Sequence, residues 1–171
     1  TINTGGDITT SGGVVLTAGQ TAATGVITEA GTGKILTASG LTTSSKGTQT
    51  LNNANTVGAF NATNTVAAGD ILLTNTAAPL SITLISQNAA GNVVINNTGG
   101  ITLNGNVNFN GNTGNLTLNA SGVINQASGA ITNNNAASTS TFAAGATNNI
   151  TLGGSNDFNE RSEEHTSELQ S

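Results

Sequence analysis

Apolar and polar residues alternate in short runs along most of this chain, so that every second side chain in a run is aliphatic. A period of two predicts short β-strands with one buried face. Clusters of Gly and Asn separate the runs and favour turns, because both residue types tolerate positive φ angles. No run has the period of an amphipathic helix, so we expect an all-β fold. The predicted inward pairs are Ile71/Leu73, Ile82/Leu84, Val93/Ile95, Ile101/Leu103, Val107/Phe109, Leu116/Leu118 and Ile150/Leu152.

These runs recur at a nearly constant spacing. The triplets Gly69-Asp70-Ile71, Gly91-Asn92-Val93 and Gly114-Asn115-Leu116 begin 22 and 23 residues apart. A longer period is also visible, because residues 25–30 resemble residues 122–127 at an offset of 97. Repeats of about 20 residues nested in partial super-repeats of about 100 are typical of stacked-coil proteins.

Strand length explains why the coils must stack. A short strand with two inward aliphatics does not form a stable sheet alone, whereas coils stacked at about 4.8 Å pair every backbone group. Each buried aliphatic then contributes roughly 1.5–3 kcal/mol. We therefore predict a parallel β-solenoid over residues 1–160, with about 22 residues per coil and on the order of seven coils in a rod of roughly 35 Å. The Asn-rich turns leave two interpretations open: amide ladders between coils, or loop residues without ladders.

The composition changes abruptly at residue 161. Residues 161–171 are dense in charge and contain no Gly, Ala or Asn. All eleven resemble the in-frame translation of a common sequencing-library adapter, so we exclude this stretch as an artefactual, non-native tail that is expected to be disordered. His165, the one His of the chain, is excluded with it. We also expect the remaining residues to be an uncapped fragment of a longer repeat protein.

Charge and cysteine content exclude several classes of partner. Only 6% of the residues are charged, and Lys34 and Lys46 are the only cations before Arg161. No basic patch can neutralise a run of phosphates, so nucleic-acid binding is not expected. The absence of Cys excludes disulfides and Cys-ligated zinc. No apolar stretch approaches the roughly 20 residues that span a bilayer, so membrane insertion is not expected either.

The sequence lacks the clustered side chains of an active site. General acid–base chemistry needs two groups placed near one substrate, and the carboxylates before the tail are scattered singly. A phosphate loop is suggested by Gly31-Thr32-Gly33-Lys34, but Ile35 stands where a Ser or Thr is needed. We therefore predict no enzymatic activity, no catalytic, cofactor-binding or metal-binding residues, and no cofactor. The carboxylates concerned are Asp7, Glu29, Asp70, Asp157 and Glu160.

Three alternatives remain open. A solenoid enzyme that processes glycans would gather carboxylates on one face, and a wide separation of Asp7, Asp70 and Asp157 would argue against it. An ice-binding solenoid would need regular outward Thr pairs, whereas Leu72 and Val94 interrupt the outward Thr positions. A disordered polar segment is favoured by low complexity and opposed by the regular aliphatics. The outward Thr residues considered are Thr83, Thr102, Thr117 and Thr151.

Two further sets of residues have simple interpretations. The Phe residues are expected to fill the interior or the corners of the coils. Asn-x-Ser/Thr triplets are possible sugar acceptors, although such triplets arise readily by chance in a chain this rich in both residue types. The Phe residues are Phe60, Phe109, Phe142 and Phe158, and the triplets include those that begin at Asn61, Asn115, Asn119 and Asn149.

Three segments carry a resemblance to a known family: residues 50–64 (TLNNANTVGAFNATN), 69–76 (GDILLTNT) and 149–158 (NITLGGSNDF). Over most of residues 1–160 the chain resembles the β-helical passenger regions of filamentous-haemagglutinin-like adhesins, which are exported by two-partner secretion, and of related autotransporter-type surface proteins. The resemblance implies a right-handed β-helix on, or released from, the outer membrane of a Gram-negative bacterium. It also implies an outer-membrane secretion partner, and attachment to host cells, glycans or abiotic surfaces through extended weak contacts.

Overall fold

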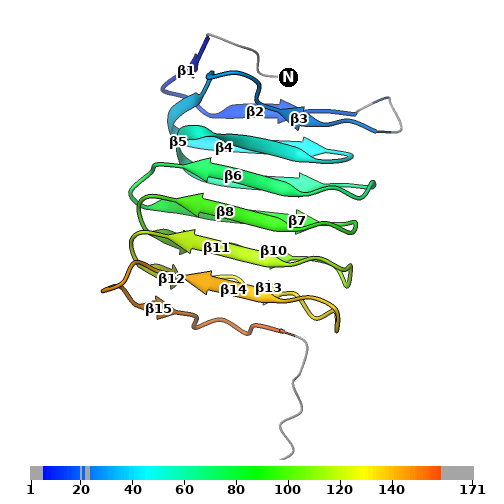
Figure 1. Cartoon of the computed structure of the whole chain (residues 1–171), viewed down its shortest axis with the longest axis vertical. Helices are drawn as coiled ribbons and strands as arrows, with labels where there is room; N and C mark the ends of the chain where they lie inside the picture. Colours follow the sequence, from blue (N-terminus) through cyan, green and yellow to red (C-terminus); the bar gives the residue numbers. More distant parts are fainter. Residues whose placement is uncertain (1–5, 20, 22–23, 159–171) are drawn as a thin grey trace, which may run out of the picture.

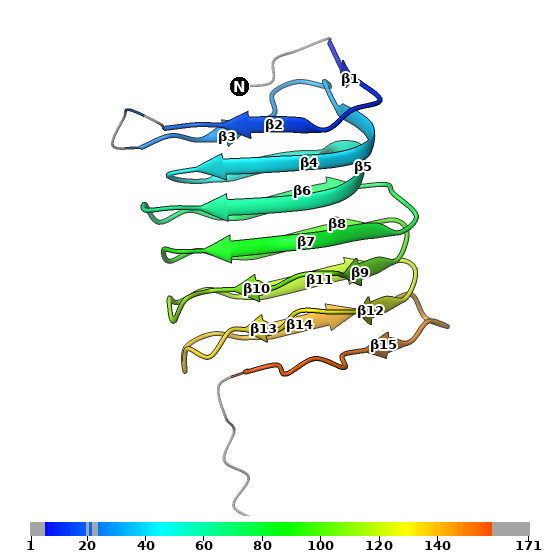
Figure 2. The ribbon, with the colours of Figure 1, turned by 180° about the vertical axis from the view of Figure 1, so that it is seen from behind.

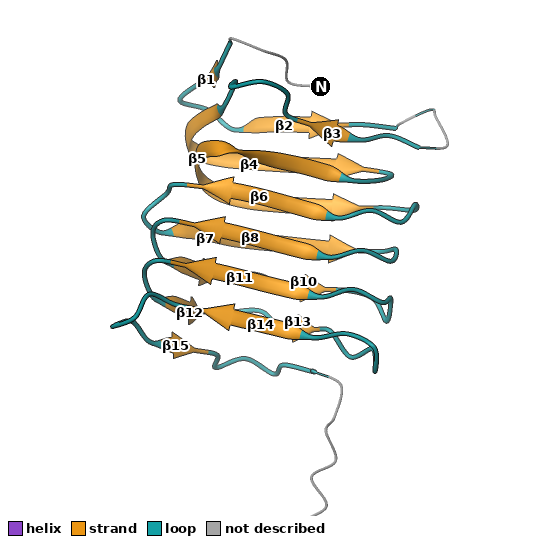
Figure 3. Ribbon diagram, in the orientation of Figure 1, coloured by secondary structure: helices purple, strands orange, loops and turns teal. Residues whose placement is uncertain are grey.

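The computed structural model describes residues 6–19, 21 and 24–158, which form a right-handed parallel β-solenoid (Figure 1). It makes about six turns of about 22 residues each, and it confirms the predicted all-β fold. No helix occurs among the described residues (Figure 3). His165 and the rest of the predicted tail, residues 161–171, lie outside them, as does Glu160.

The described residues contain fifteen strands joined in one continuous set of parallel pairings. They are β1 (Ile8–Thr9), β2 (Val14–Thr17), β3 (Ile27–Thr28), β4 (Ile35–Ser45), β5 (Gln49–Asn64), β6 (Ile71–Asn75), β7 (Leu80–Gln87), β8 (Val93–Asn97), β9 (Ile101–Leu103), β10 (Val107–Asn108), β11 (Leu116–Ala120), β12 (Ile124–Gln126), β13 (Ile131–Thr132), β14 (Ser140–Ala143) and β15 (Ile150–Thr151).

Each coil runs along one face of the solenoid and returns along the other. The front sheet consists of β3, the first part of β5, β6, β8, β11 and β14, and it faces the viewer in Figure 1. The back sheet contains the remaining strands and is seen in Figure 2. Strand β5 turns the corner and belongs to both sheets, since it pairs with β6 and with β7.

Residues of successive coils lie in register and form columns along the axis. Ile71 pairs with Val93, and Val93 pairs with Leu116, at offsets of 22 and 23 residues. The repeat period read from the Gly-Asx-aliphatic triplets is therefore the coil length. The longer similarity at an offset of 97 joins different positions of the coil, because Ile27 lies in the front sheet and Ile124 in the back sheet.

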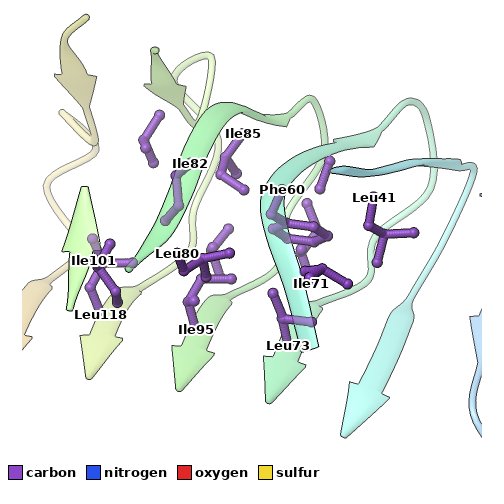
Figure 4. Close-up of a cluster of buried hydrophobic side chains, with 14 of the residues drawn as sticks. Leu41, Phe60, Ile71, Leu73, Leu80, Ile82, Ile85, Ile95, Ile101 and Leu118 are labelled. Carbon is purple, nitrogen blue, oxygen red and sulfur yellow. The ribbon is translucent and has the colours of Figure 1, made fainter. Parts of the chain in front are cut away.

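Aliphatic side chains from both sheets fill the space between them (Figure 4). Ile71, Leu73 and Ile95 from the front sheet meet Leu80 and Ile101 from the back sheet, and all are at most 1% exposed. Because each column continues through several coils, the core is one apolar cluster that extends along the axis. Phe60 and Phe109 are also buried in the interior, as predicted.

Four residues that were predicted to be buried are exposed or only half-buried. Leu84 is half-buried because a register irregularity in β7 moves the inward position to Ile85, which is fully buried. Ile150 is 43% exposed and Leu152 is half-buried, because no described coil covers the far side of β15. Phe158 is also exposed, and its ring packs edge-on against Phe142 with a centroid distance of 5.9 Å.

Candidate binding surface

A column of asparagines lies inside the solenoid at the corner where the front sheet ends. Asn55, Asn75 and Asn97 are at most 4% exposed. The Nδ2 of Asn75 donates to the Oδ1 of Asn97 across the coils at 3.1 Å, and the Oδ1 of Asn75 accepts from the backbone N–H of Val57 at 2.9 Å. Of the two open interpretations, the amide ladder is seen between two coils at this corner, where it joins Asn75 to Asn97. We call these three residues the asparagine column.

A buried carboxyl group stands next to this column. Glu29 is 6% exposed, and its Oε2 accepts from the backbone N–H of Asn53 at 2.8 Å and from the Nδ2 of Asn55 at 3.2 Å. Its buried Oε1 has no partner among the described residues. Desolvation raises the pKa of Glu29 above its ordinary value, and the hydrogen bonds from Asn53 and Asn55 oppose this only in part.

A second column of polar side chains, one carboxylate and two amides, lies outside at the corner where the front sheet begins. Asp70, Asn92 and Asn115, which we call the Asx column, each accept the backbone N–H of the residue one coil further on. The Oδ1 of Asp70 accepts from Asn92 at 2.7 Å, and the Oδ1 of Asn92 accepts from Asn115 at 3.0 Å. No hydrogen bond to another described residue involves the Nδ2 of Asn92 or Asn115. Both amides therefore keep two donors for a ligand.

Glycines beside the Asx column allow the coils to approach closely. A Cβ on Gly114 would lie 2.0 Å from the backbone oxygen of Gly91, and one on Gly91 would lie 2.2 Å from that of Gly69. A groove of about 540 Å³ runs along the axis at this corner and is lined by the repeated Gly-Asx pairs. We call it the Gly-Asx groove, and it is lined by Ala68, Gly69, Asp70, Ala90, Gly91, Asn92, Thr113, Gly114, Asn115 and Ala137.

A second groove of about 320 Å³ follows the opposite corner of the front sheet, beside the asparagine column. It forms where that column ends, because Ala120 pairs with Asn97 and offers only a methyl group. Outside it, the Nδ2 of Asn119 donates to the Oδ1 of Asn96 at 2.9 Å. The front sheet is therefore bordered on both sides by grooves that combine small apolar residues with amides and hydroxyl groups.

The strip between the two grooves is neutral and mixed in character. Its central outward column reads Thr50, Leu72, Val94, Thr117 and Thr141. Two aliphatics interrupt the hydroxyl groups, so this column lacks the regular Thr array that an ice-binding face would need. The strip contains no ionisable side chain, and among the residues that line the two grooves only Asp70 is ionisable.

The carboxylates considered at the outset lie on different coils. Asp7 precedes β1 and accepts from the backbone N–H of Lys34, Asp70 precedes β6, and Asp157 bridges to Thr132 near the last described coil. Within residues 6–158, gaps excepted, no three His, Cys, Asp or Glu side chains are grouped as metal ligands would be. No helix in the same part of the chain is long and apolar enough to cross a bilayer.

The triplet asparagines fall at separate places in the coil. Asn115 belongs to the Asx column, and Asn119 donates to Asn96 beside the second groove. Asn61 is a half-buried residue of β5 in the back sheet, and Asn149 is exposed immediately before β15. The free amides of the Asx column were missed in the sequence, although the spacing of the Gly-Asx pairs already marked their positions.

The chain matches no protein-family model, no curated protein and no solved structure. The surface of the two grooves offers neutral amide donors, hydroxyl groups and a single carboxylate, repeated along the axis at the spacing of the coils.

Proposed function

We propose that this solenoid is a structural and adhesive segment of a large secreted or surface-exposed bacterial repeat protein, and that it mediates attachment to cells or surfaces. The observation that carries the proposal is the Gly-Asx groove, where the amide donors of Asn92 and Asn115 recur one coil apart. The resemblance to two-partner-secretion and autotransporter-type adhesins supports a location at the outer membrane and export by a partner there.

The mechanism is repetition of weak contacts along a rod. One neutral hydrogen bond contributes only about 0.5–1.5 kcal/mol, but linked contacts increase the overall affinity by roughly 10²–10⁴-fold. The chemistry of the groove fits neutral, hydroxyl-bearing surfaces such as glycan coats. Because the chain has no Trp or Tyr, recognition of a sugar relies on the edges of Asn and Thr side chains.

The test compares dense and sparse display of the full chain. Beads that carry many copies and beads that carry few are passed over a surface coated with a neutral polysaccharide, and the retained fraction is measured. We expect strong retention only at high density. If densely coated beads are retained no better than beads coated with an inert protein, the adhesive proposal is wrong for this ligand class.

Matched variants locate the contact. Asn92→Asp and Asn115→Asp keep the oxygen that accepts the backbone hydrogen bond and remove the free amide donor. Asn108→Asp makes the same change on the back sheet, where the Oδ1 of Asn108 accepts from the N–H of Asn110 at 2.7 Å. We expect the groove variants together to lower retention about tenfold, which corresponds to roughly 1.4 kcal/mol. An equal loss in Asn108→Asp would show that the groove is not the site.

A further inference from the structure

The chain contains two Asn-Gly pairs, and the structure places them in contrasting surroundings. They are Asn104-Gly105, at the bend between β9 and β10, and Asn110-Gly111, in the turn after β10. In an Asn-Gly pair, the backbone nitrogen of Gly can attack Cγ of the Asn side chain and close a succinimide ring, because Gly has no Cβ to block the approach. Whether the attack proceeds depends on how freely the local backbone can rearrange.

Asn110-Gly111 occupies the exposed tip of a tight turn. The φ angles of Asn110 and Gly111 are 50° and 75°, and the N–H of Asn112 donates to the carbonyl oxygen of Phe109 at 2.9 Å. These are features of a type I′ turn. Both central residues are exposed, and a Cβ built on Gly111 would meet nothing within 4 Å. The contacts of this tip with neighbouring coils are made by side-chain amides, because the Nδ2 of Asn110 donates to the Oδ1 of Asn88 and the Nδ2 of Asn135 donates to the carbonyl oxygen of Gly111. This backbone can therefore open by breaking side-chain hydrogen bonds, without separating from a packed backbone.

Asn104-Gly105 is held in place by the preceding coil. The backbone N–H of Asn104 donates to the carbonyl oxygen of Ile82 at 2.8 Å, and its Nδ2 donates to the Oγ of Ser81 at 2.8 Å. A Cβ on Gly105 would lie 1.8 Å from the carbonyl oxygen of Thr83. Forming a ring here requires the backbone to separate from the coil against which it packs.

We infer that Asn110 is a site of spontaneous deamidation, and that Asn104 is protected from the same reaction by the fold. The backbone nitrogen of Gly111 attacks Cγ of Asn110, a C–N bond forms, and the side-chain nitrogen leaves as ammonia. Water from the solvent then opens the succinimide ring at either carbonyl and gives aspartate or isoaspartate. No oxidant, reductant or enzyme is required.

The reaction changes the surface at a defined place. The Nδ2 of Asn110 donates to the Oδ1 of Asn88 in the preceding coil, and the product has a carboxylate oxygen instead of that donor. The turn leads directly into Thr113, which lines the Gly-Asx groove. Ageing of the protein would thus add negative charge next to the Gly-Asx groove, whose one ionisable lining residue is Asp70. Isoaspartate would also lengthen the turn backbone by one atom.

The experiment incubates the full chain at mildly alkaline pH, folded and in urea, and follows both Asn-Gly peptides by mass spectrometry with isoaspartate detection. In the folded protein we expect Asn110 to convert at least about tenfold faster than Asn104, since a turn tip opens more readily than a packed bend. In urea the two rates should become similar. Gly111→Ala should slow conversion at Asn110 in both conditions.

Two results would overturn the inference. One is equal or faster conversion of Asn104 in the folded protein. The other is a folded Asn110 that stays intact while both sites convert in urea. Because wild-type protein supplies this comparison by itself, the test does not depend on whether Gly111→Ala folds.

Discussion

The side chains of Asn75 and Asn97 meet inside the solenoid, where the Nδ2 of one donates to the Oδ1 of the other at 3.1 Å. Both are nearly free of solvent contact, and Asn75 also bonds to the N–H and the carbonyl oxygen of Val57. Buried amides stabilise a structure only when their partners are present, because an unpaired buried polar group costs about 1–3 kcal/mol. This corner is therefore sensitive to substitution.

Asn75→Ala tests this sensitivity. The change leaves the N–H of Val57 and the Oδ1 of Asn97 without their partner, so we expect a loss of about 2–5 kcal/mol in the free energy of unfolding. Urea denaturation followed by far-UV circular dichroism measures it. Asn96→Ala, an exposed neighbour in the same coil, should stay within about 0.5 kcal/mol of wild type. Similar effects of the two changes would mean that the column contributes little.

Ala120→Asn should extend the asparagine column by one coil. Ala120 pairs with Asn97 and lines a groove of about 320 Å³, so an amide at this position has room and a neighbour with acceptor capacity. We expect a gain of about 0.5–1.5 kcal/mol in the free energy of unfolding. Ala120→Leu is the control for simple filling of the groove. A larger gain from Leu than from Asn would contradict the role given to the amide.

Gly114→Ala tests the close approach of the coils. The added Cβ would lie 2.0 Å from the carbonyl oxygen of Gly91, so the backbone must shift, at a cost of about 1–3 kcal/mol or more. In Gly153→Ala the added Cβ meets nothing within 4 Å, and that variant should behave like wild type. Thermal melting of the two proteins side by side gives the answer, and equal melting temperatures would refute the packing argument.

Glu29→Gln should change how stability depends on pH. Burial raises the pKa of Glu29 above its ordinary 4.5, so the folded protein holds this proton more tightly than the unfolded chain does. The contribution of Glu29 to stability is then fully present below pH 4.5 and is lost as the pH rises through the pKa of the folded state. Relative to wild type, the Gln variant should become more stable as the pH rises from mildly acidic to neutral.

Urea denaturation of both proteins across this pH range measures that difference. The orphan Oε1 of Glu29 gives the effect its structural cause, because a charge at that oxygen has no compensating donor among the described residues. A difference between the two proteins that is constant with pH would contradict the prediction.

The period of two predicts most of the core, and its failures have local causes. Ile71 and Leu73 are inward as expected, whereas Leu84 is displaced by the register irregularity in β7, which the alternation itself does not reveal. Asn75 follows Leu73 by two residues, so its inward direction was already contained in the alternation. The alternation does not reveal that an amide can be buried there, because its burial depends on hydrogen bonds to Asn97 and to the backbone of Val57, which lie on other coils.

The candidate surface was less accessible to sequence reasoning. The spacing of Gly91-Asn92 and Gly114-Asn115 predicts that they lie above one another, but not that a groove runs beside them. The groove depends on how closely the coils approach at their corners. The free donors of Asn92 and Asn115 likewise follow from the structure, because the backbone N–H of the next coil bonds to the Oδ1 of each side chain and leaves its Nδ2 unused.

The in-register stacking of the coils limits how such a gene can change in length. Inserting one residue within a straight segment turns every following side chain of that segment to the opposite face, and aliphatics would then meet water. If a whole turn is duplicated or deleted, each residue still stacks along the axis on a residue of similar chemistry. Length variants of this protein should therefore differ in steps of about 22 residues, and longer variants should form longer rods with the same cross-section.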